Sequence, residues 1–342
     1  MKTKYNLKIT SFLVLFFMMF VSCQLHGIRE SKTECEGAFV KIAGDNIIAS
    51  TGRAIRVWEL SEFGLSTVSF KTVAGKSIVK TKSSIGDWYF PWMDEEPEGK
   101  LISVESCINN DEGFMNEFIR TTVEFHYPVS KIGLKYDIWT MPGAPGFRTQ
   151  ISLKALDGFK ANEEFSHGVV EQLVRNNLLK KGQAIGYFND TQHRNMAGTP
   201  ILKTEVVDVA ENQEIDWANV LVVSGDKEGF ILAKESHKCA NQQGVNTGGF
   251  KLAAQNISVT GAGLDLEHLT NEYQPCWATW SIAYYGNEAD AKLALKQFDR
   301  KRYPIDPNRD IYIMSNTWGS GSSGANSKYA SCEENILKEL KV

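Results

Sequence analysis

The chain has 342 residues, of which 42% are hydrophobic and 11% aromatic, so it lacks the low hydrophobicity and high net charge of a disordered protein and is expected to fold. Lysine and arginine total 37 and aspartate and glutamate total 41, which gives a net charge of −4 with no block of basic residues. This balance excludes nucleic acid as an expected partner, because neutralising phosphates requires clustered lysine and arginine.

The N-terminal residues have the pattern of a targeting signal rather than of a folded domain. Three lysines within the first eight residues precede an apolar run over residues 12–21, which is too short to span a bilayer. We therefore predict a signal peptide over residues 1–22. The three lysines are the only charges before Cys23, so the mature chain carries −4 − 3 = −7, which suits an extracytoplasmic protein.

The sequence Phe20-Val21-Ser22-Cys23 resembles the bacterial lipobox, in which small residues precede a cysteine that is lipidated and becomes the new N-terminus. The resemblance implies lipidation at Cys23, a tether over residues 23–37, and an extracytoplasmic lipoprotein anchored to a membrane, in the periplasm or at the outer membrane. Several acyl chains give stable anchoring, because each buried CH₂ contributes about 0.8 kcal/mol. The alternative is an ordinary signal peptide cleaved near Cys23.

Five cysteines follow the lipobox, an odd number that argues against a disulfide scaffold. An oxidising periplasm permits pairing, and both Cys35 with Cys107 and Cys239 with Cys276 are conceivable pairs that the sequence alone does not assign. His237 lies two residues before Cys239, but no second pair of ligands follows at the spacing of a metal site. We expect no metal and no cofactor.

Strand-like alternation of apolar and polar residues dominates residues 38–286 and outweighs helical periodicity. A turn over residues 224–227, between two apolar runs, predicts a β-hairpin. So many strands without interleaved helices predict a mainly β fold, a large antiparallel β-supersandwich, rather than parallel βαβ units. The clearest predicted strands cover residues 54–60, 65–70, 118–127, 134–139 and 277–284.

Residues 287–309 are predicted to be a linker. Asn287 is placed to cap a helix over residues 288–300, which has acidic residues in its first turn and basic residues in its last. Pro304 and Pro307 are expected to end helical structure.

Residues 310–342 have the pattern of one β/α unit, with a strand over residues 310–315, a Gly/Ser loop, and the start of a helix over residues 331–342. One such unit cannot cover its own sheet edges. We therefore expect its parallel neighbours to come from sequence that the chain lacks.

The order of lipoprotein signal, β-sandwich, linker helix and the segment over residues 309–319 resembles the N-terminal portion of bacterial α-galactosidases of glycoside hydrolase family 36, the melibiase-like enzymes. Ser315-Asn316-Thr317-Trp318 is the most specific part of this resemblance, and the Gly/Ser loop after Gly319 departs from the family. The resemblance implies that residues 310–342 begin a truncated (β/α)₈ barrel.

The resemblance also implies retaining hydrolysis of α-galactosides by two aspartates of the barrel. Retaining hydrolysis requires two carboxyl groups about 5 Å apart. A barrel requires about 250 residues, whereas residues 310–342 supply 342 − 310 + 1 = 33. We interpret the acidic clusters at residues 94–96 and 163–164 as solvated loop charges, expect no catalytic residue in the chain, and predict that the chain as given is inactive.

Two groups of residues are candidates for contact with an oligosaccharide that ends in α-galactose. The resemblance implies that Trp318 packs against galactose at the end of the first barrel strand, with Asn316 hydrogen-bonding to hydroxyl groups. Trp88 and Trp92 lie in a predicted loop rich in aromatic residues, and aromatic residues in loops suggest recognition. The alternative is that these loop rings plug the end of the sandwich or pack on the barrel.

Two other functions stay open. The runner-up is a non-catalytic carbohydrate-binding lipoprotein that presents its loop aromatics to oligosaccharides. The sandwich also resembles the galactose mutarotases, in which a histidine and a glutamate act as acid and base, and His126, His167 and His193 lie in the sandwich region. The resemblance leaves a homo-oligomer open as well.

Overall fold

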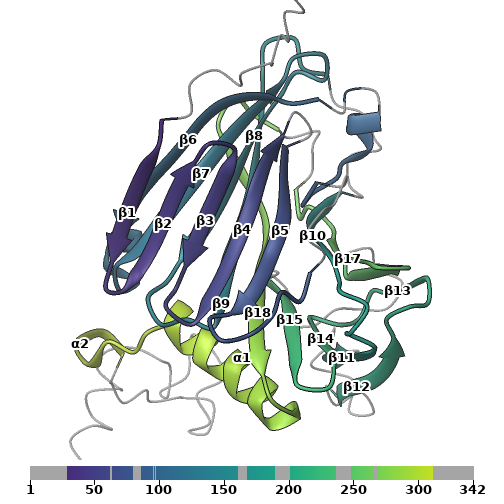
Figure 1. Ribbon diagram of the computed structural model, residues 1–342. Helices are drawn as coiled ribbons and strands as arrows, with labels where there is room; N and C mark the ends of the chain where they lie inside the picture. The colour runs from purple at the N-terminus through teal and green to yellow at the C-terminus, as the bar shows by residue number, and fades with distance from the viewer. Residues whose placement is uncertain are drawn as a thin grey trace, which may run out of the picture.

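The computed structural model describes residues 29–61, 64–79, 86–94, 96, 98–160, 168–188, 201–235, 248–264 and 269–310. Within them the chain forms three antiparallel sheets and one long helix (Figure 1). The predicted fold class is therefore confirmed for this part of the chain: it is mainly β, with large antiparallel sheets followed by a linker helix. The predicted barrel strand and helix lie outside the described residues, apart from Asp310.

The first sheet is a meander of five strands in chain order. Its inner positions alternate with outer ones; in β4, for example, Ala54, Trp58 and Leu60 are buried, whereas Glu59 is exposed. This alternation is the period-2 pattern of a strand with one buried face. The five strands are β1 (Ser31–Cys35), β2 (Ala38–Ala43), β3 (Asn46–Ser50), β4 (Ala54–Ser61) and β5 (Gly64–Thr72).

The second sheet has nine strands in the order β12-β11-β14-β15-β18-β9-β8-β7-β6, so the last strand of the chain's sandwich lies in the middle of the sheet. Its strands are β6 (Lys100–Asn109), β7 (Phe118–Tyr127), β8 (Ile132–Thr140), β9 (Gly146–Ala155), β11 (Lys181–Phe188), β12 (Ile201–Asp208), β14 (Val220–Ser224), β15 (Glu228–Glu235) and β18 (Gln274–Tyr285).

The third sheet has four strands in the order β10-β17-β16-β13: β10 (Val169–Val174), β13 (Gln213–Ile215), β16 (Phe250–Ala253) and β17 (Asn256–Thr260). It lies beyond β5 in Figure 1, and two isolated bridges, Val79 to Arg175 and Tyr89 to Val169, connect it to the chain that follows β5. The two short helical turns η1 (Pro91–Asp94) and η2 (Asp111–Gly113) flank β6.

The main core lies between the nine-stranded sheet and the two smaller sheets. Its members come from all three sheets, and the largest are almost completely excluded from solvent. Burial of each such aromatic side chain contributes about 1.5–3 kcal/mol. Examples are Trp58, Phe70, Tyr136, Phe147, Phe230 and Phe250.

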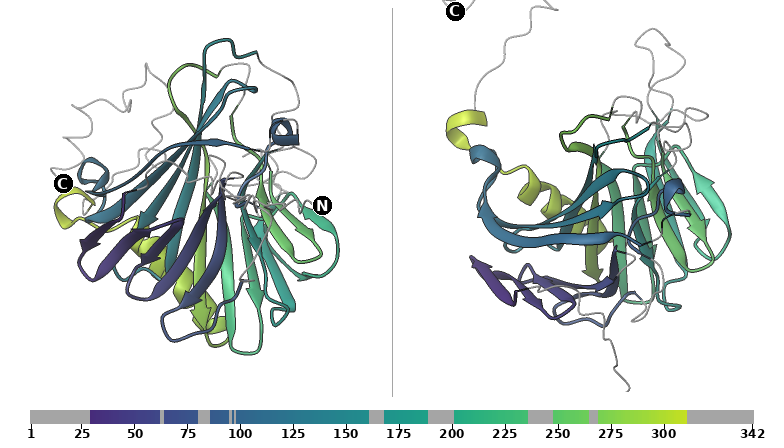
Figure 2. Two further views of the ribbon diagram at one scale, coloured as in Figure 1. Left: turned by 45° about the horizontal axis from the view of Figure 1, so that its top comes forward. Right: turned by 90° about the horizontal axis from the view of Figure 1, so that it is seen from above.

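Helix α1 (Glu288–Arg302) packs against the opposite face of the nine-stranded sheet and forms a second, smaller core there (Figure 2). The Asn287 side chain accepts a hydrogen bond from the Ala289 N–H at 2.8 Å, and the Asp290 carboxylate accepts one from the Asn287 N–H at 2.8 Å. This capping box confirms the predicted helix start. Ala291, Ala294 and Phe298 form the buried face of the helix.

Three expectations are corrected in this part of the chain. The tether predicted over residues 23–37 is wrong for Ser31–Cys35, which pair with β2 as strand β1. Pro307 does not end helical structure but begins the short helix α2 (Pro307–Asp310), because the first helical position needs no N–H donor. Asp310 therefore belongs to a helical turn. Among the described residues Cys35, Cys107 and Cys276 are free thiols.

Candidate functional site

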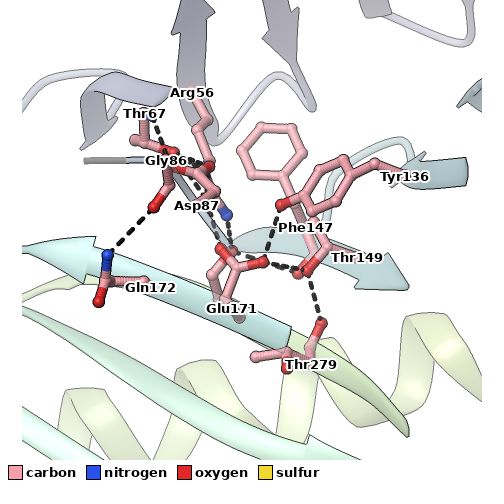
Figure 3. Close-up of polar contacts among 11 residues, drawn as sticks. Arg56, Thr67, Gly86, Asp87, Tyr136, Phe147, Thr149, Glu171, Gln172 and Thr279 are labelled. Atoms are coloured by element: carbon pink, nitrogen blue, oxygen red, sulfur yellow. Dashed lines mark hydrogen bonds and ion pairs between the residues drawn. The ribbon is translucent and has the colours of Figure 1, made fainter. Parts of the chain in front are cut away.

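A cluster of charged residues lies inside the main core, where the three sheets meet (Figure 3). The Arg56 Nη2 atom donates to Asp87 Oδ2 at 2.8 Å and to Glu171 Oε1. Arg56 Nε donates to the Thr67 hydroxyl at 2.9 Å, and Arg56 Nη1 donates to the Ser281 hydroxyl at 2.9 Å. We call Arg56, Asp87 and Glu171 with these partners the Arg56 cluster.

The side chain of each charged residue in the Arg56 cluster faces the core because of its position in a strand or turn. Arg56 follows Ala54 on the buried side of β4, and Glu171 lies in a run of β10 in which five consecutive residues are buried. Asp87 is fixed by the backbone, because its Oδ1 atom accepts from the Thr67 N–H at 2.7 Å.

The Arg56 cluster contains two carboxyl groups and only one guanidinium to compensate their charge. Glu171 Oε2 also accepts from the hydroxyls of Tyr136 and Thr149, each at 2.7 Å. Burial is the main cause that raises the pKa of Asp87 to about 7, and the Glu171 carboxylate adds to it, while Arg56 acts in the opposite direction. Burial beside Glu171 also raises the pKa of Tyr136.

A retaining glycosidase uses two close carboxyl groups in unequal environments, one as the acid and one as the nucleophile. The exposed fractions decide against that interpretation: they are 0% for Arg56, 2% for Asp87 and 0% for Glu171. A glycoside cannot reach carboxyl groups that are closed off on all sides by packed strands. The Arg56 cluster is a structural network that joins the three sheets.

The Arg56 cluster is not evident from the sequence. The available signal was a charged residue at an apolar position of two strands, Arg56 in the alternating β4 pattern and Glu171 in the apolar β10 run. A buried charge requires a partner. The sequence does not say which partner, because Arg56 and Glu171 are 115 positions apart.

A second cluster lies on the other face of the nine-stranded sheet, at the C-terminal end of α1. Glu235, the last residue of β15, accepts four hydrogen bonds, and we call it and its four donors the Glu235 cluster. The donors are Arg148 Nε at 2.6 Å, Trp280 Nε1 at 3.2 Å, Arg302 Nη2 at 3.3 Å and the Tyr303 hydroxyl at 2.9 Å.

The Glu235 cluster ties the end of α1 to the sheet. Arg148 and Arg302 more than offset the effect of burial and lower the pKa of Glu235. Phe298 packs against Trp280 with ring centroids 5.1 Å apart, and Tyr303 lies 6.2 Å from the same ring. These contacts hold the C-terminal end of α1 in one position on the sheet.

A pocket of about 400 Å³ lies beside the Glu235 cluster, between the sheet and α1. Its volume falls within the range of small-molecule sites, about 300–1,000 Å³. It is lined by Asn219, Val220, Ala233, Lys234, Glu235, Trp280, Leu295, Lys296, Asp299 and Tyr303.

The two tryptophans proposed from the sequence as sugar contacts are buried. Trp88 is 2% exposed and Trp92 is 9% exposed. Trp88 Nε1 donates to the Tyr127 hydroxyl at 3.4 Å, and the Trp92 ring packs edge-on against Tyr127 with centroids 4.6 Å apart. Their rings fill the end of the sandwich, as the alternative interpretation held, because a loop rich in apolar rings lowers its free energy by packing inward. Their hypothesised role in sugar recognition is therefore corrected.

Of the other residues proposed from the sequence, the structure describes only some. Cys23, Asn316 and Trp318 lie outside the described residues, as do His167, His193 and residues 163–164. His126 is described, and its Nε2 atom lies 3.0 Å from the Glu124 carboxylate on the outer face of β7.

Glu96 corrects the interpretation of residues 94–96 as solvated charges. It is buried, and its carboxylate accepts from the N–H groups of Val129 and Ser130 at 2.8 and 2.6 Å. It therefore closes the turn between β7 and β8. Asp94 accepts from the Tyr89 hydroxyl at 2.8 Å.

The described residues lack both a metal-binding cluster and a membrane-spanning helix. They contain no group of three or more His, Cys, Asp or Glu side chains placed to hold a metal ion. Among the same residues no helix is long and apolar enough to cross a membrane.

No family model matches the sequence, and no curated protein matches it. Solved structures with a similar backbone include several family 36 α-galactosidases and also a YidC insertase. AgaA from Geobacillus stearothermophilus has 7% identity, a TM-score of 0.44, and coverage of 73% of this chain and 42% of that chain. The α-galactosidase from Lactobacillus brevis has 6% identity, a TM-score of 0.43, and coverage of 75% of this chain and 42% of that chain.

The chain spans less than half the length of these enzymes. One AgaA variant was solved in complex with raffinose. At these identities and TM-scores the likeness assigns no residue and no activity to this chain.

Proposed function

We propose that the chain is the N-terminal β-supersandwich portion of an α-galactosidase-like retaining glycoside hydrolase, which acts on oligosaccharides that end in α-galactose. The observation that carries the proposal is the order of its parts. A β-sandwich is followed by helix α1, and the Glu235 cluster fixes the end of that helix. The next segment contains Ser315-Asn316-Thr317-Trp318, which resembles the end of the first barrel strand of such enzymes.

In this proposal the chain supplies no catalytic carboxylate. The carboxyl pair of the sandwich, Asp87 and Glu171, is buried and held by Arg56. The acid and the nucleophile therefore belong to a barrel. Asn316 and Trp318 contact the substrate at the end of the first barrel strand. Lipidation at Cys23 anchors the protein outside the cytoplasm, where oligosaccharides reach it.

The test is turnover of a chromogenic α-galactoside by the purified full chain, alongside Asp87→Asn and Glu171→Gln variants. We expect no turnover by any of the three proteins. Turnover by the full chain that either substitution abolishes, with the fold retained, would refute the proposal, because the sandwich would then hold the catalytic pair.

A second experiment tests the family assignment itself. The DNA downstream of the codon for Val342 is sequenced in all frames, and we expect it to encode a (β/α)₈ barrel with paired aspartates. A stop codon followed by unrelated sequence would overturn the assignment.

The second candidate function is non-catalytic carbohydrate binding by an anchored lipoprotein. The pocket beside the Glu235 cluster favours it, because two aromatic rings and several polar side chains meet there. Saccharide binding without turnover, together with no barrel downstream, is the result that this candidate expects.

A further inference from the structure

Four large apolar side chains are exposed together at one end of the sandwich. Leu178, Tyr285, Val73 and Leu293 have exposed fractions of 62%, 57%, 50% and 52%. Strand β5 ends at this end of the molecule, and β15 and α1 begin there, at the lower end in Figure 1. Single exposed apolar residues are common on protein surfaces, whereas a group of them marks an interaction site. We call these four residues the Tyr285 patch.

Tyr285 lies between two hollows of the surface, which make the patch continuous. One hollow, of about 350 Å³, is lined by Tyr285 and Leu178. The other, of about 400 Å³, is lined by Tyr285, Val73 and Leu293. Each hollow therefore carries one exposed leucine, and each is large enough to receive an apolar side chain of a partner.

Unpaired charges of opposite sign also lie in the two hollows. Arg53 lines the hollow of Leu293, and Asp226 lines the hollow of Leu178. Neither side chain forms a hydrogen bond or an ion pair within the part of the chain that the structure describes. A protein partner that offers a carboxylate to Arg53 and a cation to Asp226 would match both hollows.

Both unpaired charges stand on turns that the backbone holds in place. The Arg53 carbonyl accepts from the Val73 N–H at 2.9 Å. On the other side of the patch, the Gly225 N–H donates to the Glu228 carbonyl at 2.8 Å and closes the turn that contains Asp226. Turns that are already ordered lose little entropy on association, so the patch is preorganised for a partner.

We propose that the Tyr285 patch binds the same patch of a second copy of this chain. A two-fold axis that lies in the contact plane and passes between the hollows at Tyr285 places each hollow of one copy opposite the other hollow of its partner. Arg53 of each copy then faces Asp226 of the other, and Leu178 of each copy packs beside Leu293 of the other. One symmetric contact pairs both charges and covers the exposed apolar residues. The proposal does not depend on the proposed function.

The balance of charge favours a second copy over a strongly ionic partner. The first hollow has two lysines and two acidic residues on its lining, and the second has one arginine and one aspartate. A surface without net charge does not attract an anionic membrane or a nucleic acid, and it does not repel its own copy. These charged residues are Lys76, Lys227, Asp226 and Glu228 in the first hollow, and Arg53 and Asp290 in the second.

The part of the chain that follows α1 is less suited to cover the patch. Leu293 lies in the first half of α1, and the chain leaves this helix at Arg302. A helix of 15 residues spans about 22 Å, so the following segment starts from the end of α1 that is remote from the hollows. A second copy needs no such path.

The first experiment is sedimentation velocity of the full chain from about 1 to about 100 µM, because interfaces of ordinary size have dissociation constants from picomolar to micromolar. We expect a dimer whose fraction rises with concentration. A monomer throughout this range would overturn the proposal.

Charge reversal tests the location and the symmetry of the contact. In a dimer of the Arg53→Glu variant, or of the Asp226→Arg variant, both symmetric contacts bring like charges together. We expect each single variant to dimerise at least about a hundredfold more weakly, because the like-charge pair occurs twice. A dimer of unchanged strength in both variants would contradict the proposal.

Mixing the two single variants distinguishes a second copy from any other occupant. In a mixed dimer the introduced glutamate of one copy faces the introduced arginine of the other, and the second contact is the native pair of Arg53 with Asp226. We expect the mixture to dimerise although neither variant does so alone. A mixture that stays monomeric would refute the two-fold arrangement.

Two exposed valines provide a matched control for the apolar part. Val73 lines a hollow, whereas Val206 in β12 is 80% exposed and lines neither hollow. We expect Val73→Ser to weaken dimerisation at least about fivefold, since symmetry counts the loss of buried apolar area twice. Val206→Ser should leave it unchanged, and equal effects would contradict the location. Failure of dimerisation leaves the hydrolase proposal untouched, because turnover and the downstream sequence test that proposal.

Discussion

Replacing Arg56 by methionine should strongly destabilise the protein. Methionine occupies a similar length but carries no charge, so Asp87 and Glu171 lose their shared cation. The hydroxyl groups of Thr67 and Ser281 would also lose their donor. Breaking a buried ion pair by removing one partner costs about 3–5 kcal/mol.

The size of this loss should depend on pH. With the guanidinium absent, both buried carboxyl groups must hold a proton for the chain to fold, whereas unfolded Asp and Glu lose theirs near pH 4. Each additional proton that the folded variant keeps reduces its stability by about 1.4 kcal/mol per pH unit above that point. The deficit relative to the unsubstituted protein should therefore be largest near pH 8 and should shrink towards pH 5.

The assay is urea unfolding of both proteins at pH 5, 6, 7 and 8, followed by tryptophan fluorescence. Because Trp58 lies 4.6 Å from the guanidinium, its emission reports on the same part of the core. A loss below about 1 kcal/mol at pH 8, or a deficit that does not change between pH 5 and 8, would refute the view that the guanidinium compensates buried carboxylates.

Three further predictions concern single side chains. Glu171→Gln should weaken one part of the pH dependence of stability. Because the pKa of Asp87 is raised to about 7, its contribution to the free energy of unfolding is largest below about pH 4 and is lost as the pH rises towards 7, and without the Glu171 charge this decline should be shallower in urea titrations. Glu235→Gln should cost about 1.5–3 kcal/mol at pH 7, measured by urea unfolding; because the pKa of Glu235 is lowered, that cost should vanish in acid, the opposite direction to Asp87. Asn287→Ala should cost about 1 kcal/mol through loss of the helix cap, and a melting temperature unchanged within error would contradict the capping box as a stabilising element.

The strands were the most predictable part of the fold, because an antiparallel strand with one buried face leaves a period of two in the sequence. The prediction over residues 118–127 coincides with β7 (Phe118–Tyr127). Strand β1 was missed because Ser31–Cys35 are largely polar and exposed, and a strand at the edge of a sheet has no buried face to leave a pattern. The prediction that Pro307 ends helical structure was wrong because proline is as compatible with the start of a helix as with its end.

The candidate sites were less predictable than the fold. The sequence of the Trp88 and Trp92 segment predicts a loop and leaves open whether its rings contact a sugar or plug the sandwich, and the free energy of burying large rings favours the second outcome, which the structure shows. Neither the Arg56 cluster nor the Glu235 cluster is a local motif. Each forms between strands that the chain order separates, so the residue types were visible and their proximity was not.

The central position of β18 determines when the sandwich can be completed during synthesis. The strand lies between β15 and β9, and it is the last strand of the sandwich to leave the ribosome. Until then β6–β9 can form one partial sheet and β12, β11, β14 and β15 another, and the edges of β9 and β15 that later pair with β18 stay unpaired. Unpaired edges are sites of aggregation. A nascent chain that stalls before Gln274 would leave the edges of β9 and β15 unpaired, so the twelve residues Gln274–Tyr285 join two partial sheets into one nine-stranded sheet.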